Sequence, residues 1–199
     1  MVVEVFLCSS LLPVWAGPEN FLRPRPARIR AVAGNVSQVK DGGGKNLKDI
    51  RRVLNAVDEE TIHATTYMAR DIAQEAASIL RSYRYYTVAT PKDDGTLVTE
   101  ADFAVQRMVF RKLFSVPRFQ THYIDAEKDL EQAKVPHEWI KRNAANFGKA
   151  DFQWVVDPLD GTKTYAKRES NDYAFSLAVL FRGFPLFAVI VGPETGGTL

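Results

Sequence analysis

Two carboxylates that stand three positions apart offer the clearest chemistry in this sequence. Asp157 and Asp160 follow residues 152–156, a short apolar run that predicts a buried strand leading into the acids. Pro158 fixes its own φ and keeps Asp157 out of the helical region, while Gly161 can take a backbone angle that other residues resist. The pattern predicts a turn at the strand end that aims both carboxylates at one point.

Oxygen donors at such a turn suit a hard cation. The carbonyl of Leu159 lies between the two acids, so three oxygen donors from one short segment are expected to converge. Carboxylate and carbonyl oxygens are the ligands that Mg²⁺ prefers in proteins. Asp-Pro and Asp-Gly are also common turn dipeptides, so a solvated surface loop is the alternative interpretation of this pattern alone.

The full string resembles the signature of a known enzyme family. Residues 157–163, Asp-Pro-Leu-Asp-Gly-Thr-Lys, are similar to the motif of the inositol monophosphatase superfamily. Its members are Mg²⁺-dependent, lithium-sensitive phosphomonoesterases, among them bisphosphate nucleotidases and histidinol-phosphate phosphatases. Residues 92–102 resemble the family's N-terminal block, where a loop ends in Val-Thr-x-x-Asp and opens a helix, and residues 123–129 resemble a third block. The resemblance covers residues 47–199, which correspond to the N-terminal part of the family's domain.

Asp102 has two interpretations. Thr99 is a candidate N-cap, and Asp102 three residues later is the acidic partner of a capping box, so this acid can be purely structural. The resemblance implies instead that Asp102 orients the hydroxyl group of Thr162, which polarises the attacking water.

Lys128 departs from the family pattern. The third block has a strand that ends in a small residue followed by two acids, and alignment on Ile124 places Glu127 at the metal-binding acid and Lys128 at the second acid. A lysine beside a cation site either turns outward or weakens metal binding by like-charge repulsion, which Asp129 partly offsets. Taken alone, residues 125–129 are typical of a solvated charged loop.

The resemblance implies hydrolysis of a phosphate monoester with Mg²⁺ as the cofactor. The implied roles fall on the metal ligands Glu127, Asp157, Asp160 and the carbonyl of Leu159, on the catalytic residues Asp102 and Thr162, and on the phosphate-binding N–H groups of Gly161 and Thr162. Bound metal ions offset the phosphate charge and lower the pKa of a bound water, so no covalent intermediate is required.

The residues after the motif bear on the substrate, which is expected to be a small phosphorylated metabolite. Lys163 and the basic stretch 165–168 favour a 3'(2'),5'-bisphosphate nucleotidase-like activity, because inositol monophosphatases usually carry a second Thr at the position of Lys163. Histidinol-phosphate phosphatases also use Lys there, so both of these activities stay alternatives. The alternative of another class is a truncated, catalytically silent remnant that binds metal or phosphate.

The elements around the motifs indicate an α+β fold. Apolar residues recur at helical spacing over residues 58–86, and a second helix is expected between Thr99 and Pro117. Residues 170–180 and 186–191 predict two strands of a hairpin. The resemblance implies a layered αβα sandwich of the inositol monophosphatase/fructose bisphosphatase type, lacking its C-terminal α/β portion, where the family carries a Trp-Asp motif of the second metal site.

Composition fits one such domain and excludes several other classes. The chain has 199 residues, of which 46% are hydrophobic and 25% charged, and its net charge is +2. So small a charge, with no basic stripe interleaved with aromatic residues, argues against a nucleic acid polymer as partner. Cys8 is the only cysteine, which excludes internal disulfides and thiolate metal clusters. The resemblance makes a homodimer an expected assembly.

Residues 1–46 differ from the rest and are expected to be a disordered or targeting extension. Residues 2–12 are apolar but too short to span a bilayer as a helix, and Glu4 replaces the basic start of a signal peptide. Residues 21–30 are rich in Arg and contain no acid, which favours a plastid or mitochondrial address. A cytoplasmic protein with an irregular tail is the alternative, and no membrane span is expected.

Overall fold

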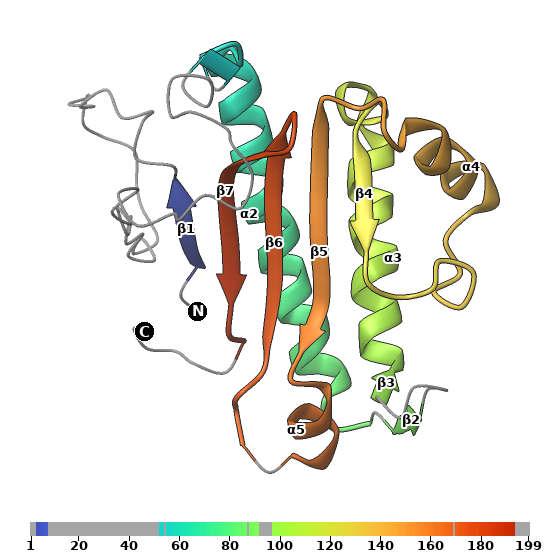
Figure 1. Cartoon of the computed structure of the whole chain (residues 1–199). Coiled ribbons are helices and arrows are strands. Elements are labelled where there is room, and N and C mark those ends of the chain that lie inside the picture. The colour runs from blue at the N-terminus through green and yellow to red at the C-terminus, as the bar shows by residue number, and fades with distance from the viewer. Residues whose placement is uncertain are drawn as a thin grey trace, which may run out of the picture.

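A mixed β-sheet of five strands forms the centre of the structure, and two long helices cover one of its faces (Figure 1). The computed structural model describes residues 3–7, 52–53, 55–86, 88–91, 97–168 and 170–193. Among these residues the helices are α2 (Glu59–Tyr83), α3 (Glu100–Ser115), α4 (His137–Asn146) and α5 (Thr162–Lys167), with a 3-10 helix η2 (Pro117–Phe119). The strands are β1 (Val3–Leu7), β2 (Ala89–Pro91), β3 (Leu97–Thr99), β4 (Tyr123–Ala126), β5 (Phe152–Asp160), β6 (Ala174–Phe181) and β7 (Phe184–Val191). This mixture of helix and sheet confirms the α+β class.

The strands of the sheet follow the order β1-β7-β6-β5-β4, and β2 pairs with β3 in a separate two-stranded sheet. β4 and β5 are parallel, whereas the other neighbouring strands of the large sheet are antiparallel. β6 and β7 form the expected hairpin, whose turn residues are Arg182 with a φ of 50° and Gly183 with a φ of 79°. Positive φ at both positions matches the twist of the two strands and stabilises the tight connection.

Helices α2 and α3 lie side by side on the sheet (Figure 1). α2 begins after Asp58, whose carboxylate accepts a hydrogen bond of 2.8 Å from the N–H of Thr61. Its buried face combines small and branched side chains, namely Ala69, Ile72, Ala73, Ala76, Ala77 and Leu80. The long helix predicted for residues 58–86 is confirmed, although it ends at Tyr83. No helix in the described part of the chain combines the length and apolar character needed to cross a membrane.

β1 lies at the edge of the sheet and runs antiparallel to β7. Val3–Leu7 thus form a strand within residues 1–46, which are expected from the sequence to be a disordered or targeting extension. Residues 8–46, including the Arg-rich stretch 21–30, lie outside the described residues.

The parallel pair β4 and β5 determines where the acids lie. Ala126 of β4 is in register with Val156 of β5, and the N–H of Glu127 continues the ladder to the carbonyl of Val156 at 3.4 Å. The next residue along β5 is Asp157, so Glu127 and Asp157 are neighbours across the pair. Because parallel strands end at the same edge of a sheet, side chains from distant segments meet there.

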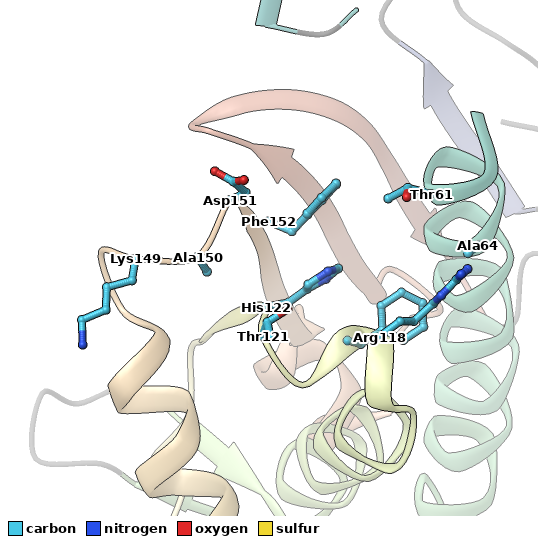
Figure 2. Close-up of a pocket in the computed structure, with 10 residues that line it drawn as sticks. Thr61, Ala64, Arg118, Thr121, His122, Lys149, Ala150, Asp151 and Phe152 are labelled. Atoms are coloured by element: carbon cyan, nitrogen blue, oxygen red, sulfur yellow. The ribbon is translucent and has the colours of Figure 1, made fainter. Parts of the chain in front are cut away.

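The opposite ends of β4 and β5 carry a hollow of about 420 Å³, lined in part by Arg118, His122 and Lys149 (Figure 2). His122 is buried there, where its Nδ1 accepts a hydrogen bond of 2.8 Å from Nε1 of Trp154 and its ring stacks on Phe152. Burial lowers the pKa of His122 to about 4. The hollow contains none of the residues expected to perform chemistry.

We expect the buried His122 to make the fold less stable in mild acid. Its pKa lies at about 4 instead of the ordinary 6.5, so its contribution is present above pH 6.5 and is lost as the pH falls toward 4. The loss from this histidine is at most about 3 kcal/mol.

Urea unfolding at about pH 7.5 and about pH 4.5 measures this contribution as a difference in unfolding free energy. The difference should be smaller for His122→Gln than for the wild type. His63→Gln, which changes a histidine with a 78% exposed side chain, should retain the wild-type difference. An unchanged pH dependence in His122→Gln would contradict the expectation.

Candidate active site

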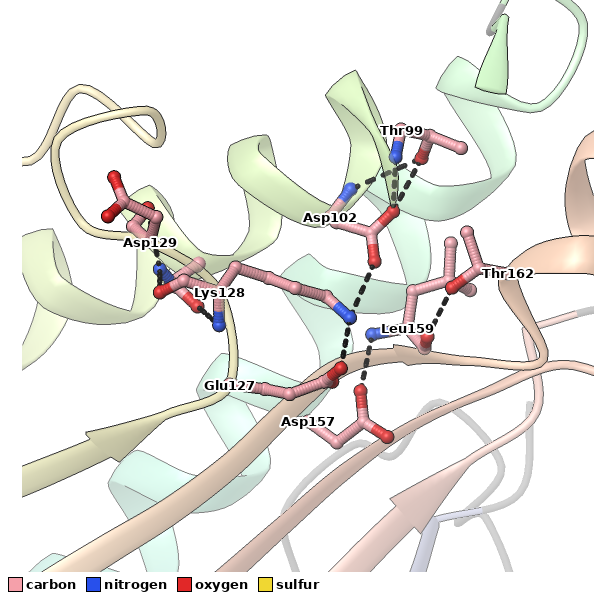
Figure 3. A network of polar contacts seen from close by, with 9 residues as sticks. Thr99, Asp102, Glu127, Lys128, Asp129, Asp157, Leu159 and Thr162 are labelled. Atoms are coloured by element: carbon pink, nitrogen blue, oxygen red, sulfur yellow. Dashed lines mark hydrogen bonds and ion pairs between the residues drawn. The ribbon is translucent and has the colours of Figure 1, made fainter. Parts of the chain in front are cut away.

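Asp102, Glu127, Lys128 and Asp157 meet at the carboxyl ends of β4 and β5 (Figure 3). Asp102 lies in the first turn of α3, Glu127 and Lys128 directly follow β4, and Asp157 lies within β5. Three segments that are far apart in sequence therefore contribute to one polar cluster. Three of the acids singled out from the sequence are members of it.

Lys128 turns into the cluster, and only 3% of its side chain is exposed. Its Nζ lies 2.5 Å from Oε1 of Glu127 and 3.2 Å from Oδ1 of Asp102. Burial lowers the pKa of the ammonium, but hydrogen bonding to Glu127 and the charges of Asp102 and Glu127 outweigh it, so the net pKa is raised. Of the two expected orientations, the outward one is therefore wrong. Asp129 does not offset this charge, because its carboxylate points away from the cluster (Figure 3). It accepts a hydrogen bond of 2.7 Å from the backbone N–H of Gln132.

Gln106 holds the backbone of Lys128 from α3, and sequence reasoning missed it. Its Oε1 accepts the N–H of Lys128 at 2.9 Å, and its Nε2 donates to the Lys128 carbonyl at 2.7 Å. Gln106 is fully buried, so both bonds are shielded from water. The sequence feature that could have identified Gln106 is its position four residues after Asp102, on the same face of the predicted helix.

Asp102 forms the capping box that the sequence predicts. Its Oδ2 accepts hydrogen bonds from the N–H of Thr99 at 2.8 Å and from the Thr99 hydroxyl at 2.7 Å. Its Oδ1 is buried and accepts no hydrogen bond, but the Nζ of Lys128 lies 3.2 Å away as an ion-pair partner. The carboxylate thus combines a structural role with a charge directed into the cluster.

Glu127 and Asp157 form a pair of like charges. Burial, a hydrogen bond to Glu127 and the charge of Glu127 raise the pKa of Asp157 to about 7. The charge of Lys128 and the N–H of Leu159, which donates to Oδ1 of Asp157 at 3.1 Å, oppose this rise only in part. Near neutral pH the pair therefore retains a proton or attracts a cation.

The strand before the motif is longer than the expected residues 152–156, and the turn begins after Asp160. β5 continues through Asp160, which pairs with Ala174 of β6, and an irregular register separates Asp157 from Asp160. Pro158 has no N–H to donate, which explains why the ladder is interrupted there. Gly161 makes the turn with a φ of 78°, and a Cβ at this position would lie 2.6 Å from the carbonyl oxygen of Asp172.

The start of α5 presents the predicted phosphate-binding groups. Gly161 is the N-cap, so the N–H groups of Gly161 and Thr162 lie at the first turn. Oγ1 of Thr162 donates to the carbonyl of Leu159 at 3.0 Å, whereas Asp102 directs its carboxylate to Thr99 and Lys128. The predicted orientation of Thr162 by Asp102 stays a prediction.

The residues present fit a divalent cation in part. Glu127 and Asp157 supply neighbouring carboxylate oxygens, and the raised pKa of Asp157 indicates that their negative charges are not fully compensated. Within the described residues no group of three or more His, Cys, Asp or Glu side chains could hold a metal ion, so Asp160 is not gathered with the other acids. A pair of carboxylates is thus the part of the expected ligand set that the structure brings together.

In the absence of metal, the fold should lose stability as the pH rises toward 7. The pKa of Asp157 is raised from 3.8 to about 7, so its contribution is fully present below pH 3.8 and is lost progressively as the pH rises through about 7. Asp157→Asn removes the charge but keeps a hydrogen-bonding group beside Glu127. In this variant the free energy of unfolding should no longer fall by the about 1–3 kcal/mol that the wild type loses as the pH rises.

Unfolding by urea at about pH 4.5 and about pH 8, with EDTA present, checks this effect. Asp125→Asn, which neutralises an exposed carboxylate on β4, is the control and should follow the wild type. If Asp157→Asn kept the pH dependence of the wild type, the expected destabilisation by the charge of Asp157 would be contradicted.

Sequence comparison places the chain in a known family. The family model described as the inositol monophosphatase family matches residues 61–199. The 3'(2'),5'-bisphosphate nucleotidase CysQ of Buchnera aphidicola is 22% identical over 141 residues, which cover 70% of this chain and 47% of that protein. CysQ of Aggregatibacter actinomycetemcomitans is 28% identical over 138 residues, which cover 67% and 46%. The chain spans about half the length of the curated relatives that it matches.

Solved structures share the fold at low sequence identity. The IMPase of Thermotoga maritima aligns with a TM-score of 0.50 and 22% identity over 66% of this chain and 44% of that one. An IMPase/NADP phosphatase complexed with Mg²⁺ and phosphate aligns with a TM-score of 0.51 and 18% identity over 67% and 45%. These structures show the fold, and the family model, which matches more than half of the residues, shows that the chain belongs to the inositol monophosphatase family.

Proposed function

We propose that this chain takes part in the Mg²⁺-dependent hydrolysis of a small phosphate monoester, with a preference for a 3'(2'),5'-bisphosphate nucleotide. The observation that carries the proposal is the paired arrangement of Glu127 and Asp157, whose charges call for a cation at the sheet edge. Membership of the inositol monophosphatase family and the similarity to CysQ proteins support the same reaction class.

Glu127 and Asp157 are the proposed principal metal ligands. The Leu159 carbonyl and Asp160 stay proposed as further ligands on the basis of the family motif, since Asp160 lies outside the paired carboxylates. A bound Mg²⁺ supplies charge that offsets the phosphate and lowers the pKa of a bound water. The chain's own contribution is to hold two carboxylates in register from two parallel strands.

Thr162 is the proposed residue that positions water. Its hydroxyl proton is directed to the Leu159 carbonyl at 3.0 Å, so its lone pairs are available to accept a hydrogen bond from a water molecule. The N–H groups of Gly161 and Thr162 lie beside it and are proposed to hold a phosphate oxygen. Water and phosphate are thereby assigned to neighbouring positions on one turn.

Lys163 is the proposed contact for a second phosphate. It is exposed on α5 next to the motif. Arg168 is a weaker candidate than the sequence indicates, because its Nε and one terminal nitrogen donate to the carbonyls of Arg84 at 3.1 Å and Tyr85 at 2.6 Å. A nucleotide with two phosphates would place one at the acidic pair and the other near Lys163.

The remaining assignments extend the proposal to the whole protein. A phosphatase domain over residues 47–199, an organellar address for residues 1–46 and a homodimer stay predictions from the sequence.

We expect the chain to release phosphate only when a divalent cation is present. Purified protein should be assayed with adenosine 3',5'-bisphosphate, inositol 1-phosphate and histidinol phosphate, with Mg²⁺, with EDTA, and with Mg²⁺ plus Li⁺. The bisphosphate should be hydrolysed at least about tenfold faster than the other substrates, because only it can contact both the acidic pair and Lys163. Release from none of the three substrates would favour the catalytically silent alternative.

The hydroxyl of Thr162 should be required for turnover but not for folding. Thr162→Val has nearly the same shape but cannot accept a hydrogen bond from water, and we expect it to lower kcat by about a hundredfold. Thr162→Ser retains the hydroxyl and should stay within about tenfold of the wild type. Thermal unfolding verifies that both variants are folded, and equal activity of the two would remove Thr162 from the mechanism.

A further inference from the structure

Lys128 places a permanent positive charge inside the acidic cluster. Its Nζ lies between Oε1 of Glu127 at 2.5 Å and Oδ1 of Asp102 at 3.2 Å (Figure 3). An ammonium group that is removed from water is strongly unfavourable unless carboxylates compensate it, and here two of them do. One of the two carboxylates, Glu127, is also a proposed ligand of the metal ion, so the ammonium and the ion would share it.

Gln106 fixes the backbone from which this side chain extends. It hydrogen-bonds both the N–H and the carbonyl of Lys128, and the ion pairs with Glu127 and Asp102 hold the ammonium itself. Glu127 differs from Lys128 in burial, because 45% of its side chain is exposed. Lys128 is thus the buried member of the pair, and Glu127 is the member that solvent reaches.

We propose that the Lys128 ammonium is an internal cation that holds one cation position of the cluster and competes with a divalent ion for Glu127. This inference rests on the proposed function, since it concerns the same acidic site. Lys128 engages Asp102 and shares Glu127, so Asp157 is the cluster carboxylate that faces an incoming ion without an ammonium in direct contact. The chain then binds divalent ions more weakly than its carboxylates alone would.

Lys112 provides a matched control for the charge change. Its Nζ also contacts two carboxylates, Asp71 at 2.5 Å and Glu75 at 2.8 Å, and only 17% of its side chain is exposed. These residues belong to α2 and α3, away from the ends of β4 and β5. Lys112→Met therefore removes a doubly paired ammonium without touching the cluster.

Isothermal titration of the full chain with Mg²⁺ or Mn²⁺ tests the proposal. Lys128→Met should bind either ion at least about tenfold more tightly than the wild type, because a like charge next to the ion is removed. Its midpoint of thermal unfolding should be lower than that of the wild type without metal and should rise more on addition of Mg²⁺. Lys112→Met should lose thermal stability as well, but should keep the wild-type affinity for both ions.

A double variant keeps the test decisive if Lys128→Met does not fold. Asp102→Asn retains the oxygen that caps α3, and Asp102→Asn/Lys128→Met removes the buried charges as a pair. The double variant should bind Mn²⁺ more tightly than Asp102→Asn alone. Equal affinities in that comparison, or in wild type and Lys128→Met, would overturn the proposal.

The outcomes separate this inference from the proposed function. Divalent binding that tightens in Lys128→Met, without phosphate release from any substrate, would support the internal cation and contradict the phosphatase. Phosphate release, together with a divalent-ion affinity that is equal in the wild type and Lys128→Met, would support the phosphatase and contradict the internal cation. No divalent binding by either protein would overturn both.

Discussion

The parallel pairing of β4 with β5 is the constraint on which the site depends. It places the residue after Ala126 beside the residue after Val156, so Glu127 and Asp157 become neighbours although thirty positions separate them. A register slip of one residue would turn every side chain of a strand to the opposite face. The core of the sheet and the charge at its edge are therefore determined by the same pairing, and one cannot change without the other.

Charge compensation is the second condition, and the chain meets it internally. Asp102, Glu127 and Asp157 place three carboxylates near one another, and the Lys128 ammonium neutralises part of their charge. The remaining imbalance is visible in the raised pKa of Asp157. A partly compensated cluster can remain folded without metal and still attract a cation, whereas full compensation would leave no such attraction.

Local patterns predicted the elements well, because each depends on contacts close in sequence. The capping box of Thr99 and Asp102 spans three residues, and the hairpin follows from a tight turn with Gly183. The inward orientation of Lys128 was not predictable, since it depends on Gln106, which lies twenty-two positions earlier. The separation of Asp160 from the other acids likewise follows from an irregular register with β6, which the motif does not reveal.

In the proposed competition, the cluster would meet a divalent ion at one carboxylate, that of Glu127. Asp102 accepts two hydrogen bonds from Thr99, and Gln106 bonds the backbone of Lys128, so hydrogen bonds connect α3 with the segment after β4. Asp157 is fixed by β5 and by the N–H of Leu159. Glu127, with nearly half of its side chain exposed, is the carboxylate that solvent reaches. In the proposed competition, an entering metal ion would therefore meet the ammonium at this carboxylate.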